Sequence, residues 1–123
     1  MPDDYSGQDL SGRDFSGQDL SKANLTDADL TRASLYRANL ADADLTRANL
    51  FRADLSGAHL TFADLRSAIL TGANLTFADL RSAILSGANF TDADLTDAFR
   101  RPGTSRADME GAIGLDKVMG LID

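Results

Sequence analysis

The residues that could carry chemistry are few in this chain of 123 residues. It contains one histidine, His59, and no cysteine, together with 19 acidic and 12 basic side chains. A zinc site needs several imidazole, thiolate or carboxylate ligands, and a hydroxyl nucleophile needs a base beside it. One histidine meets neither requirement, so we expect His59 to be a surface residue. We therefore predict no catalytic, cofactor-binding or metal site, and a protein that is not an enzyme.

Three glycines near the start of the chain could suggest a phosphate-binding loop. Gly7, Gly12 and Gly17 stand five residues apart, whereas a phosphate-binding loop groups its glycines between a strand and a helix. We interpret these glycines as turn residues of a repeat.

The overall charge argues against direct binding of nucleic acid. The chain carries a net charge of -7 at pH 7, and affinity for a phosphate backbone requires cations that displace its counterions. The sequence contains no run of 18 apolar residues, so no membrane-spanning helix is expected. Because cysteine is absent and the start, MPDDYSGQDL, lacks the basic and apolar regions of a secretory signal, we expect a cytoplasmic protein of bacterial type.

An unbroken repeat of five residues must position these side chains. A large residue, which we call the centre, stands at every fifth position from 5 to 95; sixteen centres are leucine, two are phenylalanine (Phe15 and Phe90) and one is Tyr5. Alanine stands two positions before each centre from Ala23 to Ala93 and recurs at Ala98, and Asp or Asn stands one position before the centre at fifteen of the nineteen centres.

Neither a straight helix nor a straight strand buries such a pattern on one side. Five residues of an α-helix place successive centres ~140° apart, and an odd spacing along a strand alternates their faces. A chain that turns a corner once per pentapeptide directs every centre toward a common axis, with the small alanine beside it. Ser, Thr, Gly and Asp at the remaining positions suit such corners. The pattern predicts a narrow solenoid.

The repeats ANLTD (23–27), ADLTR (43–47) and ANLTF (73–77) match the motif A(D/N)LXX, and the sequence resembles the pentapeptide-repeat family over about residues 1–98. The resemblance implies an all-β fold, namely a right-handed quadrilateral β-helix of about five coils with four pentapeptides in each. We expect this β-helix over residues 1–98 and a C-terminal cap over residues 99–123.

A longer duplication lies within the repeat. The segment LTFADLRSAILTGAN at 60–74 recurs as LTFADLRSAILSGAN at 75–89, with fourteen of fifteen residues identical. Fifteen residues make three faces of a four-faced coil, so we expect the second copy to be rotated by a quarter turn rather than stacked on the first.

The first coil carries a candidate N-terminal cap. Gln8, Arg13 and Gln18 stand where later coils have the small inward residue. Such side chains can fold over the open end and bond the unpaired backbone there. The alternative is a loose first coil on which they are solvated.

The last residues carry a candidate C-terminal cap. Leu115, Val118, Met119 and Ile122 have the i, i+3, i+4, i+7 spacing of a helix with one apolar side. We expect a short α-helical cap here. The stripe could instead pair two subunits, which leaves a monomer or a weak homodimer open, and residues 105–114 could continue the repeat out of register.

Apolar residues at positions that a corner does not require form the candidate interaction surface, because exposed apolar side chains can mark an interface. Four are aromatic and two replace Asp or Asn before a centre: Tyr36, Phe51, Phe62, Phe77, Ile69 and Ile84. Their spacings are not multiples of twenty, so we expect them on several faces.

Two functions compete. The leading hypothesis is a non-enzymatic scaffold that binds an unidentified protein partner. The alternative follows from the resemblance: acidic members of the family mimic DNA and bind DNA gyrase, a type II topoisomerase. Residues 1–20 have net charge -4 and residues 86–123 net charge -3, but residues 21–85 contain seven acids and seven bases. The negative charge is therefore concentrated at the ends, which weakens the mimicry hypothesis.

Overall fold

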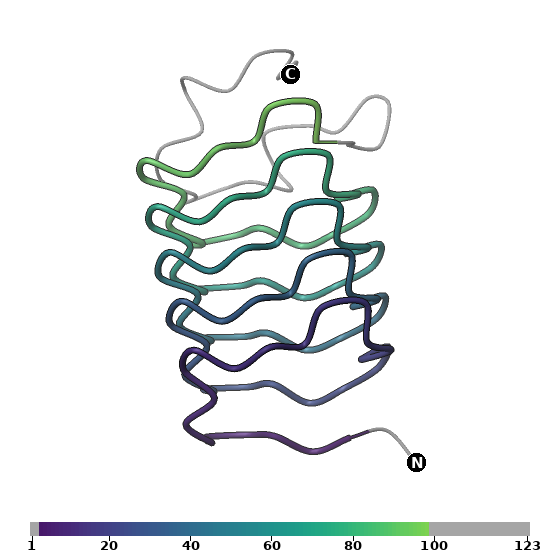
Figure 1. Ribbon diagram of the computed structural model, residues 1–123, viewed down its shortest axis with the longest axis vertical. Helices are drawn as coiled ribbons and strands as arrows, with labels where there is room; N and C mark the ends of the chain where they lie inside the picture. Colours follow the sequence, from purple (N-terminus) through teal and green to yellow (C-terminus); the bar gives the residue numbers. More distant parts are fainter. Residues whose placement is uncertain (1–2, 99–123) are drawn as a thin grey trace.

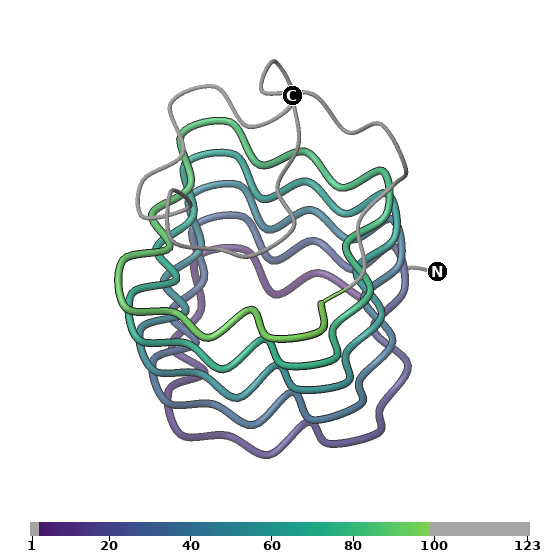
Figure 2. The same cartoon turned by 90° about the horizontal axis from the view of Figure 1, so that it is seen from above.

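The computed structural model describes residues 3–98, which wind into a rod of stacked coils (Figure 1). Viewed from above, successive coils superimpose as a four-sided outline (Figure 2). The proposed C-terminal stripe of Leu115, Val118, Met119 and Ile122 lies outside the described residues.

The register of the coils is twenty residues. Each residue before a centre forms a parallel bridge with the residue twenty positions later, as in the column Asp14, Ser34, Asp54, Asn74 and Asp94. Four pentapeptides therefore complete one coil. The predicted β-structure takes the form of isolated bridges, one per pentapeptide, from residue 4 to residue 94, and residues 3–98 contain neither a continuous strand nor a helix. Continuous strands do not form because the chain turns again after only a few extended residues.

Four faces result, and we number them by their centres. Face 1 contains Tyr5, Leu25, Leu45, Leu65 and Leu85; face 2 contains Leu10, Leu30, Leu50, Leu70 and Phe90; face 3 contains Phe15, Leu35, Leu55, Leu75 and Leu95; face 4 contains Leu20, Leu40, Leu60 and Leu80. The two residues that follow each centre make the corner of the same number.

Backbone hydrogen bonds join each coil to the next in both directions. The amide of a centre donates to the next coil, as Leu50 does to the carbonyl of Ile69 at 2.7 Å. The amide before the centre donates to the previous coil, as Asn49 does to the carbonyl of Ala28 at 2.9 Å. The ladder satisfies the backbone of the inner coils although no strand is long.

Each corner is a tight turn with one residue in the left-handed region. The alanine amide closes the turn by donating to the carbonyl of the preceding centre, as Ala53 does to Leu50 at 3.0 Å. The second residue after each centre has φ between 56° and 63° in thirteen non-glycine cases and between 68° and 72° in six glycines. A closing bond with positive φ at the third residue is the pattern of a type II turn.

The core is a column of leucines with alanines beside them. Leu50 and Ala48 are both 0% exposed, which confirms the inward assignment of both positions. Alanine is required beside the leucine because two inward residues share a narrow, close-packed interior.

Truncation of one inner centre should therefore be costly. We expect Leu50→Ala to lower the free energy of unfolding by about 2 to 5 kcal/mol, since it removes buried carbons and leaves a cavity. Leu50→Met keeps the volume and should cost less than about 1.5 kcal/mol. Urea unfolding of the two variants checks this, and equal stabilities would contradict the close-packed core.

Candidate functional site

The column of Asp and Asn residues builds the corners. Each of the fifteen carboxylate or amide side chains at this position accepts the amide two residues later, as Asn49 does from Phe51 at 3.0 Å. In many corners that residue is Ser or Thr, and its hydroxyl donates to the same oxygen, as Thr46 does to Asp44 at 2.6 Å. These residues were predicted as corner residues, but the side-chain acceptor that makes them necessary becomes visible only in the fold.

Four positions in this column lack such an acceptor: Ser34, His59, Ile69 and Ile84. The hydroxyl of Ser34 instead forms a hydrogen bond of 2.7 Å with the hydroxyl of Ser16 in the coil below. At the two isoleucines, an apolar side chain replaces a group that elsewhere stabilises the turn. Both isoleucines are exposed.

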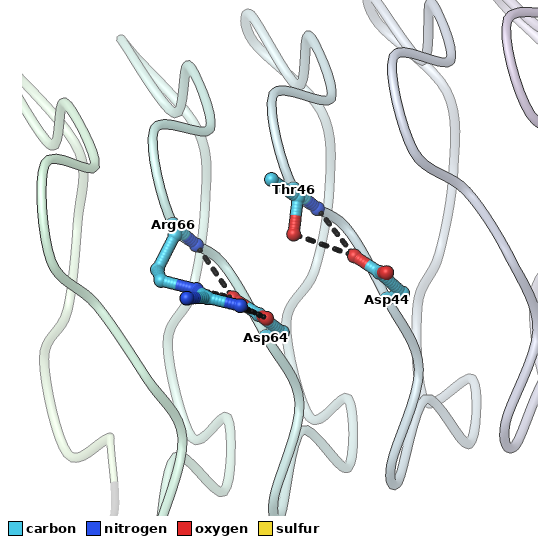
Figure 3. Close-up of polar contacts among 4 residues, drawn as sticks. All are labelled: Asp44, Thr46, Asp64 and Arg66. Carbon is cyan, nitrogen blue, oxygen red and sulfur yellow. Dashed lines mark hydrogen bonds and ion pairs between the residues drawn. The ribbon is translucent and has the colours of Figure 1, made fainter.

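Two ion pairs occupy equivalent positions in the duplicated segments. Arg66 donates hydrogen bonds to the carboxylate of Asp64 from both Nε and Nη2, at 2.9 and 2.6 Å. In the previous coil, Thr46 binds Asp44 at the equivalent position (Figure 3). Arg81 grips Asp79 at the same two distances. Hydrogen bonds from these arginines hold the pKa of both carboxyl groups below its usual range.

A third ion pair links successive coils at corner 1. Arg47 Nε and Nη2 lie 2.9 and 3.0 Å from the two oxygens of Asp27, twenty residues earlier. The hydrogen bonds from Arg47 lower the pKa of the Asp27 carboxyl. Both partners are exposed, so solvent screens the pair and its contribution to stability is small.

Phe62 and Phe77 combine exposure with backbone strain. They are 64% and 61% exposed, and their φ angles are 60° and 61°. Left-handed φ is unusual for a bulky residue, and glycine takes the equivalent position at Gly57 and Gly72. These two phenylalanines therefore contribute neither buried apolar surface nor a favourable turn conformation to the fold.

The two phenylalanines lie on either side of one face. Phe77 occupies corner 3, which leads into face 4, and Phe62 occupies corner 4, which leaves it one coil earlier. Between these corners lie the exposed His59 and, stacked on it, the buried Asp79, which pairs with Arg81 at corner 4. We call these five residues the face-4 surface.

The other predicted surface residues are distributed around the rod, as expected from their spacing. Ile69 lies on face 2 and Ile84 on face 1. Tyr36 is exposed at corner 3, whereas Phe51 at corner 2 is only partly exposed. The duplicated phenylalanines and isoleucines thus occupy different sides, because three pentapeptides advance the chain by three faces.

The proposed N-terminal cap residues are all exposed. Gln8 Nε2 lies 3.4 Å from the carbonyl of Asp4, and the guanidinium of Arg13 lies 5.5 Å from the centre of the Phe15 ring. Gln18 makes no side-chain hydrogen bond within residues 3–98. Tyr5 packs edge-on against Phe15 with ring centroids 6.0 Å apart, so aromatic centres also contribute to this end of the core.

Groups capable of acid–base or metal chemistry are dispersed. His59 stacks between Asn39 and Asp79, and no three His, Asp or Glu side chains within residues 3–98 are grouped to hold a metal ion. The part of the chain that the structure describes also has no helix suited to crossing a membrane.

Comparison with known proteins gives a consistent result. The profile of a family described as pentapeptide repeats matches residues 6–37, 33–72, 48–87 and 58–97. A pentapeptide repeat protein of the Arabidopsis thaliana thylakoid lumen is 40% identical over 76% of this chain and 72% of its own, with a TM-score of 0.64. One from Nostoc PCC 7120 is 33% identical over 89% and 83%, with a TM-score of 0.55. No curated protein matches the sequence.

The ion pair of Asp79 and Arg81 predicts a pH-dependent stability. Because the folded pKa of Asp79 is lowered, the ion pair contributes stability above the ordinary pKa of about 3.9 and loses it as pH falls through the folded value. We expect Arg81→Met to destabilise the protein at pH 7 and to have a smaller effect at pH 3. Thermal unfolding of both proteins at both pH values measures this, and an equal effect would contradict the ion pair's role.

Proposed function

Because the chain belongs to the pentapeptide-repeat family, we propose that it is a non-enzymatic interaction module that binds a protein partner through the face-4 surface. The observation that carries the proposal is the pair Phe62 and Phe77, which are exposed and have left-handed backbone conformations. A bulky apolar residue in such a position costs stability. Recognition of a partner would explain why phenylalanine stands at both positions in spite of this cost.

The arrangement of the face-4 surface suits a protein. Aromatic side chains contribute strongly to protein interfaces, and here two of them flank a polar strip formed by His59 and the Asp79–Arg81 pair. The face between the corners measures roughly 10 Å, from three extended residues at about 3.3 Å each. We propose the cytoplasm as its compartment, because the chain contains no cysteine and its fold therefore does not depend on an oxidising environment.

Substitution of the two phenylalanines should separate binding from stability. Asparagine adopts left-handed φ more readily than phenylalanine, so Phe62→Asn with Phe77→Asn should leave the free energy of unfolding unchanged or raise it by up to about 1 kcal/mol per site. The same variant should lose the partner that the wild type retains from a lysate of its source cell. Urea unfolding and affinity capture with quantitative mass spectrometry measure the two effects.

Ile69→Asn provides the matched control. It also replaces an exposed apolar residue by asparagine, but it lies on face 2 and restores the residue type usual in its column. It should keep the partner. If the control and the double variant retain the same proteins, the face-4 surface is not the binding site.

The alternative function is that the protein mimics DNA and binds DNA gyrase, which requires a continuous negative surface. The column on face 3 alternates charged and neutral residues through Asp14, Ser34 and Asp54, and exposed arginines lie at the corners beside it. Gyrase supercoiling measured with increasing protein tests the alternative. No effect at tens of micromolar protein would remove it.

A further inference from the structure

The arginines of the middle coils fall into two groups. Within residues 21–85 there are six. Three of them form ion pairs with an aspartate: Arg47, Arg66 and Arg81. The other three, Arg32, Arg37 and Arg52, are exposed and form no ion pair with any carboxylate of residues 3–98.

These three arginines border one face. Arg32 and Arg52 occupy successive coils at corner 2, and Arg37 occupies corner 3. Face 3 lies between the two corners. We call Arg32, Arg37, Arg52 and the adjacent Tyr36 and Phe51 the arginine surface.

Local packing positions two of the guanidinium groups. The guanidinium carbon of Arg37 lies 5.4 Å from the centre of the Tyr36 ring, and that of Arg52 lies 5.3 Å from the centre of the Phe51 ring. Each side chain also passes over a glycine of the next coil: a Cβ added at Gly57 would lie 3.1 Å from Cγ of Arg37. Gly72 makes the equivalent room for Arg52, with 3.2 Å to Cγ.

The charges of this surface do not balance within the described residues. Arg32 and Arg52 occupy adjacent coils of one column, about 4.8 Å apart along the rod, and like charges so placed repel. Asp54 on face 3 is the nearest acid in sequence to Arg52, but its Oδ1 accepts the amide and the hydroxyl of Ser56, at 2.9 and 2.6 Å. Asp14 lies on the same face two coils before Asp54, where its carboxylate accepts the amide of Ser16. In residues 31–37 and 51–57, three arginines and one aspartate leave the surface positive on an acidic rod.

We infer that the arginine surface binds an acidic segment of a partner protein. Guanidinium groups bind carboxylates in a bidentate geometry, as three other arginines of this chain already do. On an extended peptide, carboxylates two residues apart project from one side at a spacing of ~6.6 Å. This lies between the ~4.8 Å coil spacing and the ~10 Å face width, so the long arginine side chains on both corners can reach such carboxylates. A long polyanion would also meet the rest of a chain with net charge -7. This inference concerns face 3, which meets the face-4 surface only at corner 3, and does not depend on the face-4 surface.

The test uses defined probes and the full chain. A fluorescein-labelled peptide of six Glu-Ala repeats is titrated with protein at low salt, and anisotropy reports binding. We expect Arg37→Gln with Arg52→Gln to weaken binding by about tenfold or more. Asp54→Asn keeps an acceptor for the corner and removes a negative charge, so it should tighten binding by about two- to fivefold.

A matched double variant separates the site from net charge. Arg47→Gln with Arg66→Gln removes the same charge from corner 1 and should change the affinity by less than about twofold. Circular dichroism confirms that the variants are folded.

Three outcomes would overturn the inference: no binding of the peptide at millimolar protein, equal losses in both double variants, or equal binding of a twelve-residue oligothymidylate. If the inference fails while Phe62→Asn with Phe77→Asn still loses its partner, the proposed function stands.

Discussion

The register of twenty residues is the constraint on which the rest of this structure depends. Because the bridges place each residue directly beneath the one twenty positions later, every side chain has a nearest neighbour of the same role at about the strand spacing of 4.8 Å. Any feature that does not suit its own column, such as an oversized inward residue, would disturb the coils on both sides. The uniform alternation of buried leucine and alanine follows from this requirement.

The same register determines the chemistry of the surface. A side chain outside the core meets the residues one coil above and below it as well as those two positions away in its own coil, so its charge is balanced locally. Asp27 and Arg47 balance each other in this way, while Arg37 extends over Gly57 and Arg52 over Gly72. Glycine in these corners therefore does more than permit positive φ, because it leaves room for a long neighbour.

The sequence was sufficient to predict the core and the faces but not the surface interactions. Period five with leucine and alanine implied inward columns. The ~140° between successive centres excluded a straight helix, and the odd spacing excluded a straight strand. The role of Asp and Asn as acceptors of a corner amide was missed, because it depends on a turn whose backbone angles the pattern does not reveal. The division of the arginines was also not predicted, although only one of the three ion pairs depends on the coil register. The sequence does place Arg66 and Arg81 two residues after their aspartates, but the pairing of Arg47 with Asp27, twenty residues earlier, becomes visible only in the fold.

The fifteen-residue duplication shows how such a rod can change without a new core. Adding three pentapeptides lengthens the coil path by three faces, so everything that follows is turned relative to everything that precedes it. The motif Phe-Ala-Asp-Leu-Arg accordingly lies on face 1 at residues 62–66 and on face 4 at residues 77–81. Insertion or loss of one pentapeptide thus rotates the residues that follow it by about 90° around the axis of the rod. A lineage of such proteins could redirect one end of the molecule toward a different neighbour while each buried leucine keeps the same environment.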